Sequence, residues 1–175
     1  MPMKTGSTSK MTLPLKWLCL VTVLGVLCPT EAVLDQTLEA RFTAQGYTMS
    51  MGNTVAYKVH NEPRTWHEAV QVCRGEEARL AIIDSYEKVR VIGGMKPFNA
   101  YVWVGVSRSD PQHPWITADE GASMNNVPWA PTKPSGPFNC LTVRGCNRGL
   151  SNEDCSQRKG FVCEKSPVNP SIRYD

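Results

Sequence analysis

The sequence predicts an α+β domain in which two helices pack on short antiparallel sheets beside a long loop region. Two helix patterns come early in the chain, short strand patterns come mostly later, and a proline-rich stretch interrupts the strands. Helices and strands that occupy separate parts of a chain are typical of α+β domains. A chain of 175 residues, 41% of them hydrophobic, is sufficient for one domain with its own core.

Both predicted helices begin at capping residues. Thr65 and Glu68 form a capping box, in which each side chain can satisfy a free backbone N–H of the other. The helix that follows presents one apolar face, so we expect its cysteine to be buried: Trp66, Ala69, Val70 and Cys73. Residues 84–87 repeat the capping chemistry and open a second helix, which Gly93-Gly94 is expected to end.

Alternating or continuous apolar residues predict the strands. They are expected at residues 53–60, where Pro63 breaks the run, and at 78–83, 101–106, 140–143 and 161–164. Residues 107–138 contain six prolines and little periodicity, although Trp115 and Trp129 indicate that this segment is folded. A loop of this length inside a domain is commonly functional.

The N-terminus has the layout of a secretory signal peptide. Lys4, Lys10 and Lys16 form a basic region, residues 17–28 form a short apolar core, and Thr30-Glu31-Ala32 offers a cleavage site. The alternative is a membrane anchor, but the apolar core is shorter than the ~20 residues that span a bilayer. We therefore expect a secreted, extracellular protein without a membrane span. Its parts are a signal peptide (1–32), an N-terminal arm (33–52), a domain (53–165) and a flexible tail (166–175).

The remaining composition favours a binding protein over an enzyme. A net charge of +3, much of it in the signal peptide, gives no reason to expect nucleic acid. His60, His67 and His113 fit no metal-binding spacing, and no nucleophile elbow, phosphate loop or dinucleotide fingerprint occurs. Five basic residues near the C-terminus are either a patch for an anionic glycan or lipid A phosphate, or scattered solvated charges: Arg144, Arg148, Arg158, Lys159 and Lys165.

Several landmarks together resemble the C-type lectin-like domain over residues 46–165. They are Trp66 and Ala69 before Cys73, residues 78–82, Trp103-Val104-Gly105-Val106 at the family's WIGL position, Trp129, Cys140, Cys155 and Phe161-Val162-Cys163-Glu164. The sequence pattern between Gly46 and Trp66 is similar to that of insect hemolymph lectins, including the immulectin and lipopolysaccharide-binding types. The resemblance implies a calcium-bridged sugar site or a derivative of one.

The resemblance also implies how the cysteines pair. Five cysteines follow the signal peptide, and an odd number in an oxidising compartment leaves one as a free thiol or an intermolecular link. The family's scheme joins Cys73 to Cys163 and Cys140 to Cys155. Cys146 is then the extra cysteine, and it is a candidate for a disulfide-linked dimer.

The family's calcium ligands are poorly represented. The Glu-Pro-Asn type triplet falls on Lys133-Pro134-Ser135, a Glu position falls near Phe138, and the Trp-Asn-Asp triplet falls on 150–152. Neutral side-chain oxygens remain only at Ser135, Ser151 and Asn152, whereas calcium takes six to eight oxygens. We expect no calcium at this site and no other cofactor. The alternative is a shifted register in which Asn152, Glu153 and Asp154 turn inward. The family proline that matches Pro134 is often cis, and this loop could keep that form without a metal ion; an ordinary trans proline is the alternative.

The function that follows is that of a secreted binding protein. The resemblance implies recognition of microbial surface glycans, lipopolysaccharide or a protein partner, in innate immunity, through residues 107–138 and the region between Cys140 and Cys155. The alternatives are a calcium-dependent carbohydrate-binding lectin and a non-immune secreted scaffold or interaction protein.

Overall fold

The computed structural model describes residues 31–50, 55–144 and 148–166, and the chain divides into the units Met1–Thr37 and Leu38–Asp175. Helix α1 (Glu31–Ala44) begins in the first unit and ends in the second. All other described elements belong to the second unit, which is the domain discussed below. The predicted signal peptide up to residue 30, Cys146 and the tail from residue 167 lie outside the described residues.

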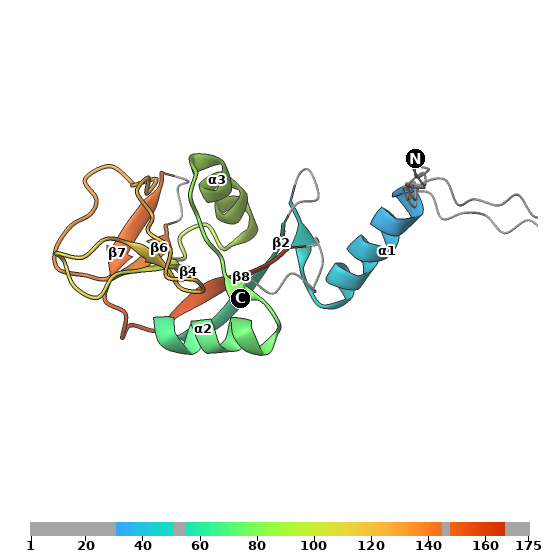
Figure 1. Ribbon diagram of the computed structural model, residues 1–175, viewed down its shortest axis with the longest axis horizontal. Helices are drawn as coiled ribbons and strands as arrows, with labels where there is room; N and C mark the ends of the chain where they lie inside the picture. Colours follow the sequence, from blue (N-terminus) through green and yellow to red (C-terminus); the bar gives the residue numbers. More distant parts are fainter. Residues whose placement is uncertain (1–30, 51–54, 145–147, 167–175) are drawn as a thin grey trace, which may run out of the picture. The chain divides into compact units, whose positions relative to one another are not determined.

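Within the described residues, eight strands form one mixed sheet (Figure 1). Six of them lie side by side in the order β1 (Thr48–Met49), β2 (Ala56–Arg64), β8 (Lys159–Lys165), β4 (Val102–Ser107), β6 (Cys140–Val143) and β7 (Leu150–Glu153). The short strands β3 (Arg79–Leu80) and β5 (Ile116–Thr117) pair with β8 and β4. The α+β class is confirmed. The predicted antiparallel sheets form a single sheet, however, in which β4 and β8 run parallel.

The two central helices cover opposite faces of this sheet. Helix α2 (Trp66–Gly75) and helix α3 (Tyr86–Met95) lie on either side of it in Figure 1. Side chains alternate between the faces of a strand, so Val102, Val104 and Val106 of β4 pack in the α3 cluster while Trp103 packs in the α2 cluster. The sheet is therefore buried on both sides.

The start of α2 follows the prediction closely. Thr65 accepts a hydrogen bond from the Glu68 N–H, and the Glu68 carboxylate accepts one from the Thr65 N–H at 2.9 Å. The buried face is the predicted one: Trp66, Ala69, Val70 and Cys73. The Trp66 indole donates to the Val104 carbonyl at 2.9 Å, which fixes the helix to the central strand.

Two predicted boundaries were wrong, and tertiary packing explains both. Helix α3 continues through Gly93-Gly94 to Met95 because Val89 and Ile92 are buried in the core, which outweighs the low helix propensity of glycine. The next residue, Lys96, is the C-cap, and its extended backbone is the conformation expected before a proline. Strand β2 includes Pro63, which is tolerated because the pairing with β8 shifts register between His60 and Arg64.

Part of the predicted N-terminal arm belongs to the domain. Residues 33–52 include most of α1 and the strand β1, which pairs with β2. Tyr47 is buried, and its hydroxyl donates to Glu76 at 2.7 Å. The sequence pattern is weak here because most of residues 38–50 are exposed and one aromatic side chain provides the main anchor. Among the described residues, no helix is both long and apolar enough to cross a membrane.

Thr65→Ala should destabilise the domain by about 1 kcal/mol, because one N-terminal N–H of α2 loses its acceptor. Urea denaturation followed by circular dichroism measures the change. Gln71→Ala, at an exposed position of the same helix, is the matched control. Equal effects of the two substitutions would contradict the capping role of Thr65.

Candidate functional site

Residues 107–138 form the long loop, and the core holds its first half in place. Strand β5 in this segment pairs with β4. The Arg79 guanidinium contacts the Asp119 carboxylate at 2.6 Å and the buried Glu164 carboxylate, also at 2.6 Å. Arg108 lies over the Trp115 ring at 4.4 Å and donates to the Phe138 carbonyl at 3.2 Å. The loop is thus an ordered surface.

Trp129 fastens the second half of the loop to β7. The Leu150 N–H donates to the Pro128 carbonyl at 2.8 Å, and the Ala130 N–H donates to the Leu150 carbonyl at 2.9 Å. Gly149 makes this contact possible, because a Cβ there would collide with the backbone of Trp129 and its φ is +121°. The Trp129 ring packs edge-to-face on Trp115 with centroids 5.3 Å apart.

Two disulfides join the pairs that the sequence resemblance implied. Cys73 of α2 is bonded to Cys163 of β8, across 90 residues of sequence. Cys140 of β6 is bonded to Cys155, which follows β7, across 15 residues. The second bond closes the hairpin that carries the far edge of the candidate site. Cys146 falls between β6 and β7 in the sequence and lies outside the described residues.

Asn152 fixes the tip of the long loop. Its side chain is fully buried, and its Oδ1 accepts from the Ser135 N–H at 2.8 Å. Its Nδ2 donates to the Ser135 carbonyl at 3.0 Å and to the Phe138 carbonyl at 3.1 Å. The peptide between Lys133 and Pro134 is cis. One buried amide therefore holds the backbone of the loop on both sides of Gly136.

The predicted site residues meet at this tip, but they do not fit a calcium ion. The Lys133 ammonium donates to the Ser135 hydroxyl at 2.8 Å, which places a positive charge where the family's triplet has an oxygen donor. Phe138 is exposed, and Ser151 is buried within β7. The Asn152 oxygen is already hydrogen-bonded. These positions offer far fewer free oxygens than the six to eight that calcium needs.

The shifted arrangement also brings few oxygens together. Asn152 does turn inward, whereas Asp154 is exposed and accepts from the Ser156 N–H and hydroxyl at 3.0 and 2.9 Å. These hydrogen bonds hold the pKa of Asp154 below its ordinary value. Glu153 is only partly buried, at the end of β7. Asp154 thus forms a solvated turn and is directed to local backbone.

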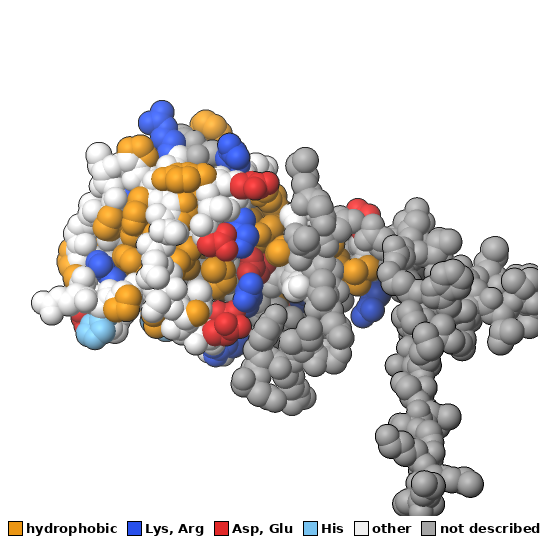
Figure 2. Space-filling model, turned by 45° about the horizontal axis from the view of Figure 1, so that its top comes forward, with side chains coloured by type: hydrophobic (Ala, Val, Ile, Leu, Met, Phe, Trp, Pro, Cys, Tyr) orange, Lys and Arg blue, Asp and Glu red, His pale blue; other side chains and the backbone are white. Residues whose placement is uncertain are grey.

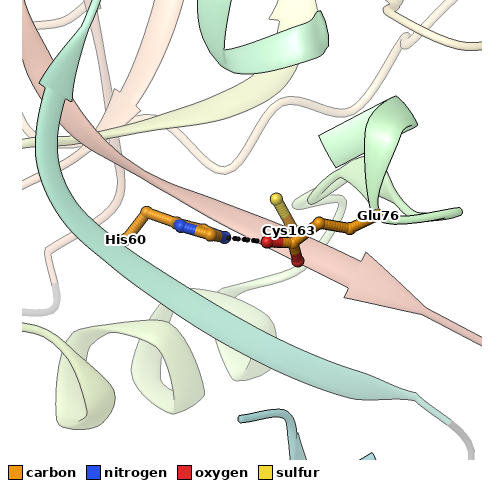
Figure 3. Close-up of side chains that lie close together, drawn as sticks. All are labelled: His60, Glu76 and Cys163. Atoms are coloured by element: carbon orange, nitrogen blue, oxygen red, sulfur yellow. Dashed lines mark ion pairs between the residues drawn. The ribbon is translucent and has the colours of Figure 1, made fainter. Parts of the chain in front are cut away.

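A separate polar cluster lies where β2, β8 and the end of α2 meet, and there His60, Glu76 and Cys163 lie close together (Figure 3). His60 Nε2 is 3.4 Å from Glu76 Oε1, and the His60 ring stacks on Phe161. Cys163 cannot act as a thiolate ligand because its sulfur is bonded to Cys73. Only two donors remain, which is too few for a zinc site. Sequence spacing could not reveal this cluster, because its members lie far apart in the chain.

Burial lowers the pKa of His60, although the nearby Glu76 carboxylate opposes this effect. For Glu76, burial alone would raise the pKa, but hydrogen bonds from Lys58 and Tyr47 hold it below its ordinary value. The cluster is therefore a neutral histidine beside an ionised carboxylate at neutral pH.

Four of the five C-terminal basic residues make their contacts in three different places. Arg158 contacts Glu68 at 3.3 Å, and Lys165 donates to Gln45 at the other end of β8. Arg144 and Lys159 lie over the Tyr101 ring at 5.5 and 5.4 Å. On the face drawn in Figure 2, basic and acidic side chains are interspersed over the described surface. Scattered charge therefore describes these residues better than a single anionic-ligand surface.

The family model described as "Lectin C-type domain" matches residues 62–165. The chain belongs to the C-type lectin domain family. This confirms the resemblance drawn from Trp66, Trp103 and the cysteines. Members of this family are generally binding proteins and not enzymes.

One relative is the "NKG2-E type II integral membrane protein" of Homo sapiens, 28% identical over 111 residues, which are 61% of this chain and 43% of that protein. The chain spans about half the length or less of the first curated relatives it matches. The similarity therefore concerns the domain, and the remaining parts of those relatives are not matched.

Two solved structures show the same fold. The calcium-independent type II antifreeze protein has a TM-score of 0.61 and 22% identity, with 69% of this chain and 92% of that chain covered. The C-type lectin domain of murine dendritic cell inhibitory receptor 2, in complex with N-glycan, has a TM-score of 0.61 and 16% identity, with 70% and 97% covered. Identities this low support the shared fold alone.

Asn152→Ala should destabilise the domain by about 2 kcal/mol and loosen the loop tip, because the backbone groups of Ser135 and Phe138 lose their hydrogen bonds to this buried amide. Urea denaturation and limited proteolysis, with cleavage sites mapped by mass spectrometry, measure the two effects. Asn126→Ala is the matched control, since that amide is exposed. New cleavage near residues 133–138 in the first variant only is the expected result, and equal protection of both would contradict it.

Stability should fall by about 1 kcal/mol between about pH 7.5 and about pH 5.5, and His60→Phe should remove most of this loss. The unfolded histidine gains a proton as the pH drops below 6.5, whereas the buried one resists it, so acid favours the unfolded state. Phenylalanine can keep the stacking on Phe161. Urea denaturation of both proteins across this pH range is the measurement. An unchanged pH dependence in the variant would show that other groups cause the loss.

Proposed function

We propose that this chain is a secreted lectin-like binding protein that recognises glycans of microbial surfaces, lipopolysaccharide among them, without calcium at the primary sugar site. The observation that carries the proposal is that the side chain of Asn152 is fully hydrogen-bonded within the protein. Its amide is bonded to the loop backbone, and Lys133 brings a positive charge to the same tip. A cation at this site would have to break these hydrogen bonds and overcome electrostatic repulsion.

Other features support this function. The basic start and apolar core of residues 1–32 favour secretion, and the phrasing near residues 46–66 resembles insect hemolymph lectins, which favours a role in innate immunity. One protein of the same fold is calcium-independent and another has been solved with an N-glycan, so the fold is compatible with both parts of the proposal. A protein ligand on the same loop surface is the second candidate, favoured by the exposed Phe138 ring.

The decisive experiment is a glycan and bacterial-surface array probed with the full chain in calcium and in EDTA. We expect equal binding under both conditions, because no ion is needed at the loop tip. Melting temperature should also be unchanged by added calcium, since an ion that bound the folded state would raise it. Binding that EDTA abolishes, together with a calcium-dependent rise in melting temperature, would favour a calcium-dependent lectin. Binding to no glycan or bacterial surface would leave the protein-ligand or scaffold alternatives.

Secretion and assembly can be tested on the same preparation. Expression of the full chain in insect cells should yield protein in the medium whose N-terminus is Val33. Non-reducing electrophoresis should show a dimer that Cys146→Ser abolishes. Retention in the membrane fraction would contradict secretion, and a monomer with one alkylatable thiol would contradict the dimer.

A further inference from the structure

We propose that a groove between the start of α3 and the long loop binds a neutral sugar ring without a metal ion. The proposal rests on the proposed function, for which it names a binding site and a ligand class. The groove is distinct from the loop tip, because Lys133, Ser135 and Asn152 are not among its lining residues.

The groove has the size and walls of a small-molecule site. Its volume is about 340 Å³, near the lower end of the roughly 300–1,000 Å³ that such sites occupy. One wall is formed by residues 84–86 at the start of α3, and the other by residues 125–129 of the loop. A shallow groove of this size suits one or two sugar rings better than an extended peptide.

Two aromatic residues, Tyr86 and Trp129, line the groove and are already held in place. The side chain of Tyr86 is 54% exposed, yet its hydroxyl donates to the Trp129 carbonyl at 2.9 Å. Trp129 is partly buried and packs on Trp115. Sugar rings present C–H groups on one face, and rigid aromatic rings supply apolar area for them at little cost in conformational entropy.

The polar groups of the groove match hydroxyl groups. Asn125 and Asn126 are exposed, and within the described part of the chain their side chains have no hydrogen-bond partner. An amide offers both donors and an acceptor, which suits a sugar hydroxyl that donates and accepts. The Asp84 carboxylate, held by Lys88 at 3.0 Å, adds a further acceptor at the edge.

The charge of the lining selects a neutral ligand. The eight lining residues include one carboxylate, at Asp84, and no lysine or arginine. Because Lys88 is paired with Asp84 and no lining residue is basic, an anionic sugar or a phosphate would find no unpaired positive charge among the lining residues. A neutral hexose or N-acetylhexosamine is therefore the class that fits.

The experiment titrates the full chain in EDTA with methyl α-mannoside, methyl β-galactoside and methyl N-acetyl-β-glucosaminide, with glucuronate as the anionic comparison. Saturation-transfer NMR and tryptophan fluorescence report binding. Tyr86→Ala should raise the Kd about tenfold, and Asn126→Ala should raise it severalfold. Tyr86→Phe, which keeps the ring, should have a smaller effect. Phe98→Ala, at a 76% exposed ring outside the groove, should have none.

The outcomes separate this proposal from the proposed function. If the wild type binds a sugar and neither Tyr86→Ala nor Asn126→Ala changes the Kd, the proposed groove is wrong. It is also wrong if the full chain binds glycans on the array but none of the three sugars. Both results leave calcium-free glycan recognition intact. Tighter binding of glucuronate would overturn the neutral class. A wild type that binds neither these sugars nor any array surface would contradict both proposals. Asn126 is exposed, so Asn126→Ala keeps the test valid even if Tyr86→Ala misfolds.

Discussion

The last strand, β8, connects the parts of this domain. It pairs with β2, β3 and β4, and its Cys163 is bonded to α2. The next residue, Glu164, is a buried carboxylate. Burial raises its pKa, and the positive charges of Arg79 and Lys88 oppose this rise. Arg79 neutralises it and at the same time holds Asp119 of the long loop. A buried charge of this kind needs its partner, so the position of the loop depends on the core.

The candidate site shows how protein groups help to order a lectin-type loop. In this chain the buried amide of Asn152 and the contacts of Trp129 with β7 hold the loop tip and its base. A side-chain amide supplies donors and an acceptor in fixed directions, whereas an ion attracts oxygens from many directions. The loop backbone can therefore keep its shape, including the cis peptide before Pro134, through hydrogen bonds.

This arrangement separates the ordering of the loop from ligand binding. Asn152 is buried and satisfied, so it stabilises the surface without facing a ligand. Exposed aromatic and amide groups lie away from Asn152 as well, at Tyr86 and residues 125–126. Such a division lets the surface vary in chemistry while the tip stays constant, because the hydrogen bonds of Tyr86 and those of Asn152 involve different residues.

The amino-acid sequence by itself determined the local features of this protein. The capping box at Thr65, the apolar face ending at Cys73 and the buried strand around Trp103 all depend on neighbouring residues, so periodicity and capping chemistry were sufficient to predict them. The unfavourable calcium-site residues were also visible, since Lys133 and Phe138 lack suitable oxygens whatever the fold.

Tertiary structure decided the features that join distant segments. Helix α3 crosses Gly93-Gly94, and β2 crosses Pro63, because packing and a register shift outweigh local preference. The cluster of His60 and Glu76, the Asn152 contacts and the groove at Tyr86 combine residues 16 to 43 positions apart. A sequence pattern reports which residues repeat along one element, and it carries no information on which elements meet in space.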